Sequence, residues 1–186
     1  YNRDFFNEYM KRIINNAERY RRKFSLLIFD IDYFKKINDT YGHSTGDYVL
    51  KAISEIVKKN IRKSDVFVRI GGDEFIIIFS EINKLSGATI ADKIRKIIGE
   101  NKYIGIESGQ VTISMGITDY EEKDTLENII DKADKALYSA KEKGRNRVCI
   151  DKMWLINNLS QKSYMKIPSK GRNLMQNNSY IELMFL

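Results

Sequence analysis

A pair of glycines between two apolar runs is the feature that most constrains the fold. One run is Val66-Phe67-Val68, the other is Phe75-Ile76-Ile77-Ile78-Phe79, and the glycines are Gly71 and Gly72. Because both runs are β-branched and aromatic, they predict two strands, and the glycines predict a tight hairpin turn with positive φ at both positions. The hairpin presents Asp73 and Glu74 beside backbone without Cβ atoms, where a phosphate chain and its metal ion can approach. A hairpin that only covers a core explains the stretch equally well.

A further apolar run predicts the centre of the sheet. Residues 24–31 are apolar on both alternating faces, which is typical of a strand covered on both sides. The run delivers Asp30 and Asp32, and the two-residue period of a strand points both carboxylates to the same side. Carboxylates fixed at the end of a rigid strand can build a metal site. Carboxylates that cap the next segment are an equally good interpretation of this pair.

The rest of the chain alternates between helical and strand patterns. Amphipathic helices are predicted at 3–20, 45–59 and 84–98, and a further helix starts at Asp124 and stops at Gly144. Strands are predicted at 104–107, 111–118 and 147–150, and segment 33–47 is rich in turn-forming residues. This order predicts one α/β (α+β) sandwich with a mixed, mostly antiparallel sheet flanked by helices. Because strand rather than helix follows Gly72, the glycines form neither a P-loop nor a dinucleotide fingerprint.

Composition excludes several classes of function. The net charge is +7, but the basic residues are dispersed and form no track with aromatic residues, so we expect no nucleic-acid partner. Cys149 is the only cysteine, which excludes an internal disulfide. The apolar runs are too short to span a bilayer, and no secretory signal is present. We expect a cytoplasmic protein, either free or the cytoplasmic part of a larger membrane-anchored one.

The two ends of the chain have their own character. The chain begins at Tyr1 rather than Met, so we expect a longer protein with a sensor domain upstream. From 152 onward the chain is rich in Asn, Ser and Lys and has no clean period. We predict a folded domain at 1–151 and a tail of unknown role at 152–186, with packing of the tail onto the domain as the alternative.

Several polar residues have simple structural interpretations. Ser44 and Asp47 match a capping box at the start of a helix. His43 is the only histidine, and it is predicted to be a hydrogen-bonding loop residue rather than a general base. Lys141 and Arg145 lie near the end of a predicted helix, where cations interact favourably with the helix dipole.

Several motifs occur together, and with them the sequence resembles the GGDEF domain family, the diguanylate cyclases. The matching motifs are Asn2-Arg3, which resembles the end of the family's N-terminal turn, the segment from Asp30 to Asp39, Gly42-His43-Ser44-Thr45-Gly46-Asp47, the signature Gly71-Gly72-Asp73-Glu74-Phe75, Val111 to Ile117, Ala133 to Tyr138, and Lys141 with Gly144-Arg145-Asn146. The resemblance covers about residues 1–150 and does not reach the tail. It implies a palm-like fold shared with nucleotidyl cyclases and polymerases, in which two GTP are condensed into cyclic di-GMP, a bacterial second messenger, with release of pyrophosphate.

The resemblance also implies a metal and substrate site. Asp30, Asp73 and the backbone carbonyl of Ile31 would hold two Mg²⁺ or Mn²⁺ ions per active site, which suits hard oxygen ligands. Asp73 would also accept the proton of the 3′-hydroxyl, and Glu74 would add negative charge beside the metals. The residues implied in substrate binding are Asn38 and Asp47 at the guanine edge, His43 beside them, Gly71 and Gly72 at the turn, and the backbone amides of Tyr33 and Phe34 with Lys35, Lys141 and Arg145 at the triphosphate.

Regulation and assembly follow from the same resemblance. Arg62 and Asp65 stand at the family's Arg-x-x-Asp site for product inhibition by cyclic di-GMP; a surface ion pair that contributes little to stability is the alternative. Each domain would hold one GTP, so a homodimer is required to bring two half-sites together. The competing functions are a catalytically idle module that senses GTP or cyclic di-GMP, a cyclase of altered nucleotide choice, and a docking platform that acts through the apolar tail.

Overall fold

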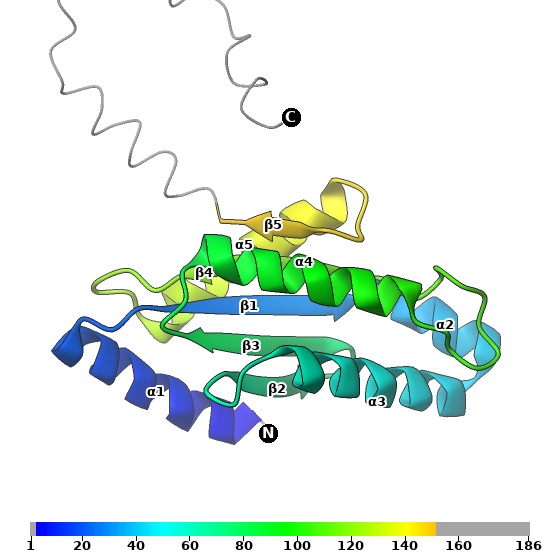
Figure 1. Cartoon of the computed structure of the whole chain (residues 1–186), viewed down its shortest axis with the longest axis horizontal. Helices are drawn as coiled ribbons and strands as arrows, with labels where there is room; N and C mark the ends of the chain where they lie inside the picture. The colour runs from blue at the N-terminus through cyan, green and yellow to red at the C-terminus, as the bar shows by residue number, and fades with distance from the viewer. Residues whose placement is uncertain (1–2, 152–186) are drawn as a thin grey trace, which may run out of the picture. The chain divides into compact units, whose positions relative to one another are not determined.

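The computed structural model describes residues 3–151, and the predicted tail at 152–186 lies outside the described residues (Figure 1). The helices are α1 (Arg3–Tyr20), α2 (Phe34–Tyr41), α3 (His43–Asn60), α4 (Lys84–Glu100) and α5 (Leu126–Glu142); the strands are β1 (Phe24–Ile31), β2 (Val66–Gly71), β3 (Glu74–Ser80), β4 (Ile113–Asp119) and β5 (Val148–Ile150). No helix between residues 3 and 151 combines the length and apolar content that a membrane crossing requires.

The described strands form one mixed sheet in the order β2-β3-β1-β4-β5. The neighbours from β2 to β4 pair antiparallel, whereas β4 and β5 pair parallel. The prediction of a mixed, mostly antiparallel sheet is therefore confirmed. β1 lies between β3 and β4, so the run of apolar residues at 24–31 occupies the centre, as predicted for a strand covered on both sides.

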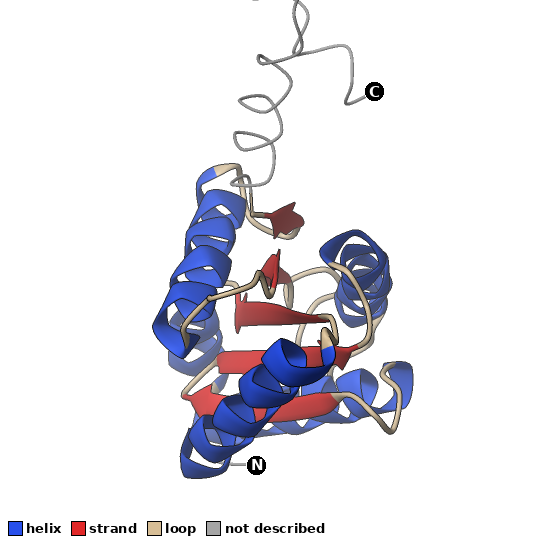
Figure 2. Cartoon of the chain, turned by 90° about the vertical axis from the view of Figure 1, so that its left-hand side faces the viewer, coloured by secondary structure: helices blue, strands red, loops and turns tan. Residues whose placement is uncertain are grey.

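Helices cover both faces of the sheet, and each face has its own core (Figure 2). On one face, Leu27, Phe29 and Ile31 of β1 pack with the apolar sides of α3 and α4. On the other face, Leu26 and Ile28 pack with α1 and α5. The side chains of β1 thus alternate between two cores, as the two-residue period of a strand requires.

Two glycines allow helices to lie close to the sheet. A Cβ at Gly116 of β4 would lie 2.2 Å from the backbone nitrogen of Leu137, so no side chain fits between β4 and α5. On the face of the sheet opposite α5, a Cβ at Gly87 of α4 would lie 2.6 Å from Ile117 Cδ1. These close approaches fix the height of α4 and α5 above the sheet, and α5 carries Lys141 to the end of β1.

Two element predictions are wrong. Segment 34–41 is a helix, although Asn, Asp and Thr lower its helix propensity, because Ile37 and Phe34 pack into the first core. Segment 104–107 is not a strand: Gly105 has a φ of +78°, and the amide of Ile106 donates to the carbonyl of Tyr103 at 3.1 Å in a turn. The apolar pattern at 104–107 was too short to distinguish a strand from a turn.

The start of α5 also differs from the prediction. Thr125 rather than Asp124 caps this helix, and its hydroxyl accepts from the amide of Asn128 at 3.2 Å. Asp124 instead accepts from the buried Lys132 ammonium at 2.9 Å. The cap is therefore one residue later than predicted, because the Asp124 carboxylate binds Lys132 in the second turn of the helix instead.

Candidate active site

The carboxylates of Asp30 and Asp73 meet where β1 ends and β2 turns into β3. Asp30 lies directly opposite Glu74 in the register of β1 and β3, and Asp73 precedes Glu74 in the turn. The Asp30 side chain is only 13% exposed, and its Oδ2 accepts from the Lys141 ammonium. Its Oδ1 is buried and has no hydrogen-bond partner. An orphaned carboxylate oxygen in a buried place is costly, so this atom is suited to a cation.

The turn that carries Asp73 is not built as predicted. β2 continues to Gly71, so Gly72 and Asp73 form the turn, and neither glycine has a φ in the left-handed region. The register shifts between Arg69 and Gly71, and the Arg69 guanidinium donates to the Gly72 carbonyl at 2.6 and 3.0 Å. An irregularity in β2 and a side-chain clamp therefore shape the turn in place of positive φ. A Cβ at Gly72 would meet nothing within 4 Å, which leaves this backbone open to an approaching group.

Burial and the neighbouring charges govern the ionisation of Asp30. Burial is the largest cause that raises its pKa to about 6; the nearby Asp73 carboxylate also raises it, and Lys141 opposes both. Two carboxylates this close repel each other when both are ionised, and a divalent cation removes that repulsion. The described residues contain no group of three or more His, Cys, Asp or Glu that could enclose a metal ion. Mg²⁺ is commonly held by one or two carboxylates with water and substrate phosphates, so the residues present fit such an ion.

Asp32 has a different task from Asp30. It is almost fully buried and accepts from Thr112 Oγ1 at 2.7 Å, Ser114 Oγ at 2.6 Å and the amide of Asn146 at 3.1 Å. All three donors belong to segments far along the chain. The two strand-end carboxylates are therefore not a matched pair of ligands: Asp30 lies beside Asp73, and Asp32 fastens three segments together.

Positive groups lie at the start of α2, which follows β1. Tyr33 ends the loop after β1 in a left-handed conformation and begins α2 without a side-chain cap, so the first amides of α2 are not used by a capping residue. Arg145 lies with its guanidinium carbon 4.5 Å from the centre of the Tyr33 ring. Lys35 is exposed on the first turn of α2. An uncapped helix N-terminus with Lys and Arg nearby is suited to phosphate groups.

Asn38 lies where α2 meets α3, beside the residue that precedes Asp47. The side chain of Asn38 lies against Gly46, because a Cβ at residue 46 would be 1.8 Å from Asn38 Oδ1. Asp47 is exposed on the next position of α3, and His43 is the exposed first residue of this helix rather than a loop residue. The predicted capping box of Ser44 and Asp47 is wrong, since Gly42 precedes the helix and no side chain caps it. Asp47 therefore has no capping role at the start of α3.

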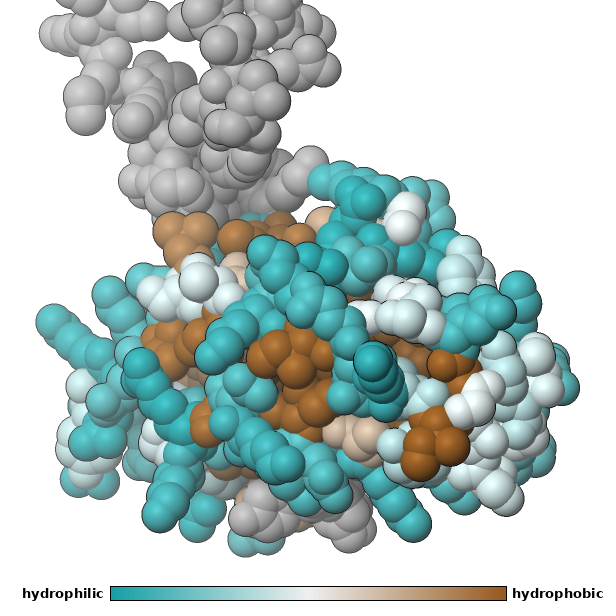
Figure 3. All heavy atoms as spheres, turned by 45° about the vertical axis from the view of Figure 1, so that its right-hand side comes forward, coloured by the Kyte–Doolittle hydropathy of each residue, from teal (hydrophilic) through white to brown (hydrophobic). Residues whose placement is uncertain are grey.

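These positions lie at one end of the sheet. Figure 1 shows α2, the end of β1 and the turn between β2 and β3 on the same side of the domain. Figure 3, which brings that side forward, shows a mostly hydrophilic surface interrupted by apolar patches. The sequence pattern of one protein family, described as "Diguanylate cyclase, GGDEF domain", matches residues 1–147. The chain belongs to the GGDEF domain family.

Individual relatives support this assignment. Diguanylate cyclase A of Treponema denticola is 39% identical over 153 residues, which is 80% of this chain and 41% of that protein. Diguanylate cyclase DosC of Escherichia coli is 40% identical over 149 residues, covering 79% of this chain and 32% of the relative. This chain thus spans less than half the length of either protein. The crystal structure of the GGDEF domain of DgcB from Caulobacter crescentus, in complex with c-di-GMP, is 30% identical and covers 81% of this chain and 91% of that chain, with a TM-score of 0.75.

The two residues of the Arg-x-x-Asp motif lie apart from the GGDEF turn, at the start of β2. Arg62 and Asp65 line a shallow pocket of about 210 Å³ with Lys58 and Lys63. The carboxylate of Asp65 accepts from the amides of Arg62 at 2.8 Å and Ser80 at 3.2 Å. Asp65 therefore closes the loop by backbone contacts, and the simple surface ion pair with the Arg62 side chain is not the arrangement found.

Sequence reasoning missed several residues that shape the GGDEF site. Arg69 clamps the turn, whereas Thr112, Ser114 and Asn146 hold Asp32. Arg69 could have been suspected from its place beside the glycines. The other three carry no local signal, because their role depends on contacts with a residue at least 80 positions away.

Proposed function

We propose that this GGDEF domain is a diguanylate cyclase that condenses two GTP into cyclic di-GMP and releases pyrophosphate. The observation that carries the proposal is the buried, unpartnered Oδ1 of Asp30 beside the Asp73 carboxylate, with Lys141 and the uncapped start of α2 at the same place. A catalytically idle sensing module has no need for two closely spaced carboxylates, whose repulsion a bound divalent cation relieves. The acidic residues Asp30, Asp73 and Glu74 are all intact.

Two divalent ions, Mg²⁺ or Mn²⁺, would be held by Asp30, Asp73 and the backbone carbonyl of Ile31. When bound, such ions supply positive charge that stabilises the attacking 3′-oxygen and the leaving pyrophosphate. Asp73 accepts the proton of the 3′-hydroxyl, and Glu74 beside it adds to the negative field that holds the cations. Gly71 and Gly72 leave the backbone of the turn accessible to the substrate, as the open space above Gly72 supports.

The chain's positive groups bind the triphosphate in this proposal. Lys141 and Arg145 each supply a charge, and the amides of Tyr33 and Phe34 at the start of α2 donate to phosphate oxygens, with Lys35 nearby. The stacking of Arg145 on the Tyr33 ring supports this role, because it holds the guanidinium at the uncapped end of α2.

Asn38 and Asp47 read the guanine edge, with His43 beside them, and their placement gives a test. We expect Gly46→Ala to weaken GTP binding by about tenfold, because the new Cβ displaces the Asn38 amide and removes a hydrogen bond to the base. The measurement is the dissociation constant of 3′-deoxy-GTP, which lacks the attacking hydroxyl and is not consumed. Gly99→Ala in α4 is the matched control, because its Cβ meets nothing within 4 Å. Affinity within twofold of the parent for Gly46→Ala would contradict the role of Asn38.

Each domain holds one GTP in this proposal, so catalysis needs two domains face to face across a two-fold axis. We expect the specific activity of the 186-residue chain to rise with protein concentration and to vanish toward nanomolar protein. The measurement is the initial rate against protein concentration, with a chain ending at Asp151 to show whether the domain 1–151 suffices without the tail. A rate strictly proportional to protein down to nanomolar would refute the requirement for a dimer.

Product inhibition fits the pocket at the Arg-x-x-Asp motif. Arg62, Lys58 and Lys63 offer three positive charges for the phosphates of cyclic di-GMP. The Asp65 carboxylate already accepts hydrogen bonds from two backbone amides, so a contact with guanine would be an additional hydrogen bond.

Incubation with GTP and Mg²⁺, followed by identification of products by mass, tests the proposed function directly. Cyclic di-GMP from GTP and no cyclic dinucleotide from ATP support it, because Asp47 selects guanine. If GTP binds and no product forms, even in a forced dimer, the sensing function replaces the cyclase function.

A further inference from the structure

The turn after α5 holds an unusual backbone conformation. Gly144, Arg145 and Asn146 have φ values of +104°, +60° and +45°, and Tyr33, on which Arg145 stacks, has +56°. Non-glycine residues avoid this left-handed region, and a bulky residue stays there only when its surroundings hold it. Contacts elsewhere in the domain must therefore hold Arg145 in place.

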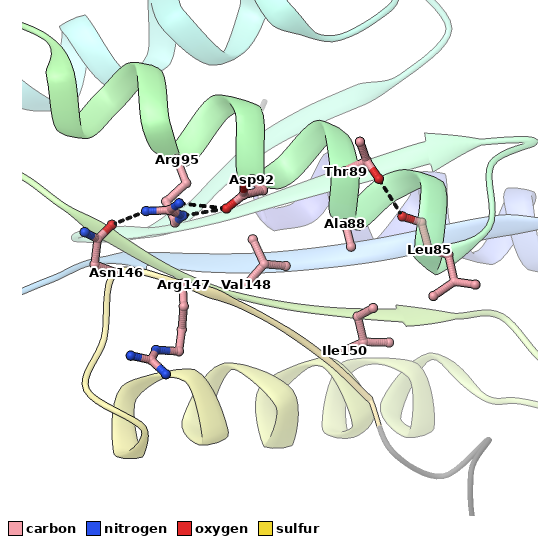
Figure 4. Close-up of a pocket in the computed structure, with 9 residues that line it drawn as sticks. All are labelled: Leu85, Ala88, Thr89, Asp92, Arg95, Asn146, Arg147, Val148 and Ile150. Atoms are coloured by element: carbon pink, nitrogen blue, oxygen red, sulfur yellow. Dashed lines mark hydrogen bonds and ion pairs between the residues drawn. The ribbon is translucent and has the colours of Figure 1, made fainter. Parts of the chain in front are cut away.

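Asn146 is held from two sides. Its amide donates to Asp32 Oδ2 at 3.1 Å, and its side-chain Oδ1 accepts from Arg95 Nη1 of α4 at 2.8 Å. The Arg95 guanidinium is itself fixed by Asp92, whose Oδ1 accepts from Nε at 2.8 Å and lies 2.8 Å from Nη2. Figure 4 shows this chain of contacts from α4 to the turn that follows α5.

The contact from Arg95 lies beside an open groove. The groove has a volume of about 520 Å³. Apolar side chains of α4 and β5 line one part of it, and Asp92, Arg95 and Asn146 line another (Figure 4). Because side chains do not fill this space, a polar contact rather than close packing joins Arg95 to the turn. The Arg95 side chain is only 17% exposed, whereas Asn146 is exposed, so the hydrogen bond between them lies at the surface.

We propose that Arg95, oriented by Asp92, is a positioning residue for triphosphate binding. Through Asn146 it holds the turn in which Arg145 stands over Tyr33. This inference rests on the proposed function, because Arg145 must contact the triphosphate for its position to matter. Arg95 itself touches no substrate; loss of its contact leaves the turn held from the Asp32 side only at Asn146, and this loosening lets Arg145 shift from its place.

A double-mutant cycle with Arg145 tests the proposal. The readout is the dissociation constant of 3′-deoxy-GTP and of GMP, which lacks the two outer phosphates. We expect Arg95→Ala to weaken binding of 3′-deoxy-GTP about fivefold and binding of GMP less than twofold, because only the triphosphate contact is disturbed. Arg145→Ala is expected to cost about tenfold. Since Arg95 acts through Arg145, the double variant should bind within about twofold of Arg145→Ala.

Lys96→Ala is the matched control. Lys96 pairs with the same Asp92, at 3.0 Å, and its removal deletes the same charge from α4 but leaves the contact to Asn146. We expect its affinity for both nucleotides to match the parent. If Arg95→Ala does not fold, Asn146→Gly removes the same hydrogen bond from the other side and suits a left-handed backbone.

The outcomes separate this inference from the proposed function. A double variant about fiftyfold weaker than the parent, or equal losses for 3′-deoxy-GTP and GMP, overturns the role of Arg95 and leaves the cyclase standing. A parent that binds neither nucleotide overturns both.

Discussion

Replacing Asp73 with asparagine is expected to lower the rate of cyclic di-GMP formation about a thousandfold. Asparagine keeps the size of the side chain, but it provides neither the base nor the negative charge beside Asp30 that the proposed mechanism assigns to Asp73. The measurement is the amount of product by mass over time, at saturating GTP and Mg²⁺ and at the highest protein concentration used for the parent.

Folding of this variant serves as an internal check. Asp73 raises the pKa of the buried Asp30 by repulsion, so its neutral replacement removes an unfavourable contact from the folded state. We expect the thermal midpoint without metal to equal or exceed that of the parent. Asp131→Asn makes the same chemical change at an exposed residue that pairs with Lys135, and it should leave the rate unchanged. A rate for Asp73→Asn within tenfold of the parent would refute the assignment.

Replacing Asp32 with alanine is expected to lower the free energy of unfolding by about 3 kcal/mol. The change leaves the hydroxyls of Thr112 and Ser114 and the amide of Asn146 without their acceptor in a place with little access to water. Urea unfolding followed by circular dichroism measures the loss. Ser114→Ala, which removes one of the three donors, should cost about 1 kcal/mol.

The same experiment distinguishes a structural carboxylate from a metal ligand. Because Asp32 fastens protein segments, the loss should be equal in EDTA and in Mg²⁺. A loss that appears only when Mg²⁺ is present would show that Asp32 is a metal ligand. That interpretation was one of the two that the sequence left open, because the two-residue period points Asp30 and Asp32 to the same side.

Predictions from local patterns were the most successful. The apolar runs at 24–31 and 75–79 are central strands because a two-residue period and β-branched residues fix both the element and its faces. Local patterns indicated that Asp30 ends one strand and that Asp73 lies in the turn between two others. The pairing of Asp30 with Asp73 came only from the family resemblance, because the neighbouring positions of β1 and β3 depend on the sheet order.

Predictions failed where distant residues decide the outcome. The partners of Asp32 lie at least 80 positions away, and the bond between Arg95 and Asn146 spans 51 positions, so no spacing in the sequence points to them. Helix α2 forms because Ile37 is buried by the fold, despite polar residues that favour a turn. The glycines of the turn need no positive φ, because an irregularity in β2 and the Arg69 clamp shape the turn. Neither feature leaves a signal in the local sequence pattern.

The sheet divides the domain into two separately packed cores, and this division bears on how such a site changes over evolutionary time. Asn38 and Asp47 stand on helices of the first core, whereas Lys141 stands on α5 in the second. In the proposed site, the residues at the guanine edge therefore rest on the first core, and Lys141 at the triphosphate rests on the second. Substitutions in α5 can alter the phosphate contact of Lys141 over evolutionary time without touching the residues that select the base.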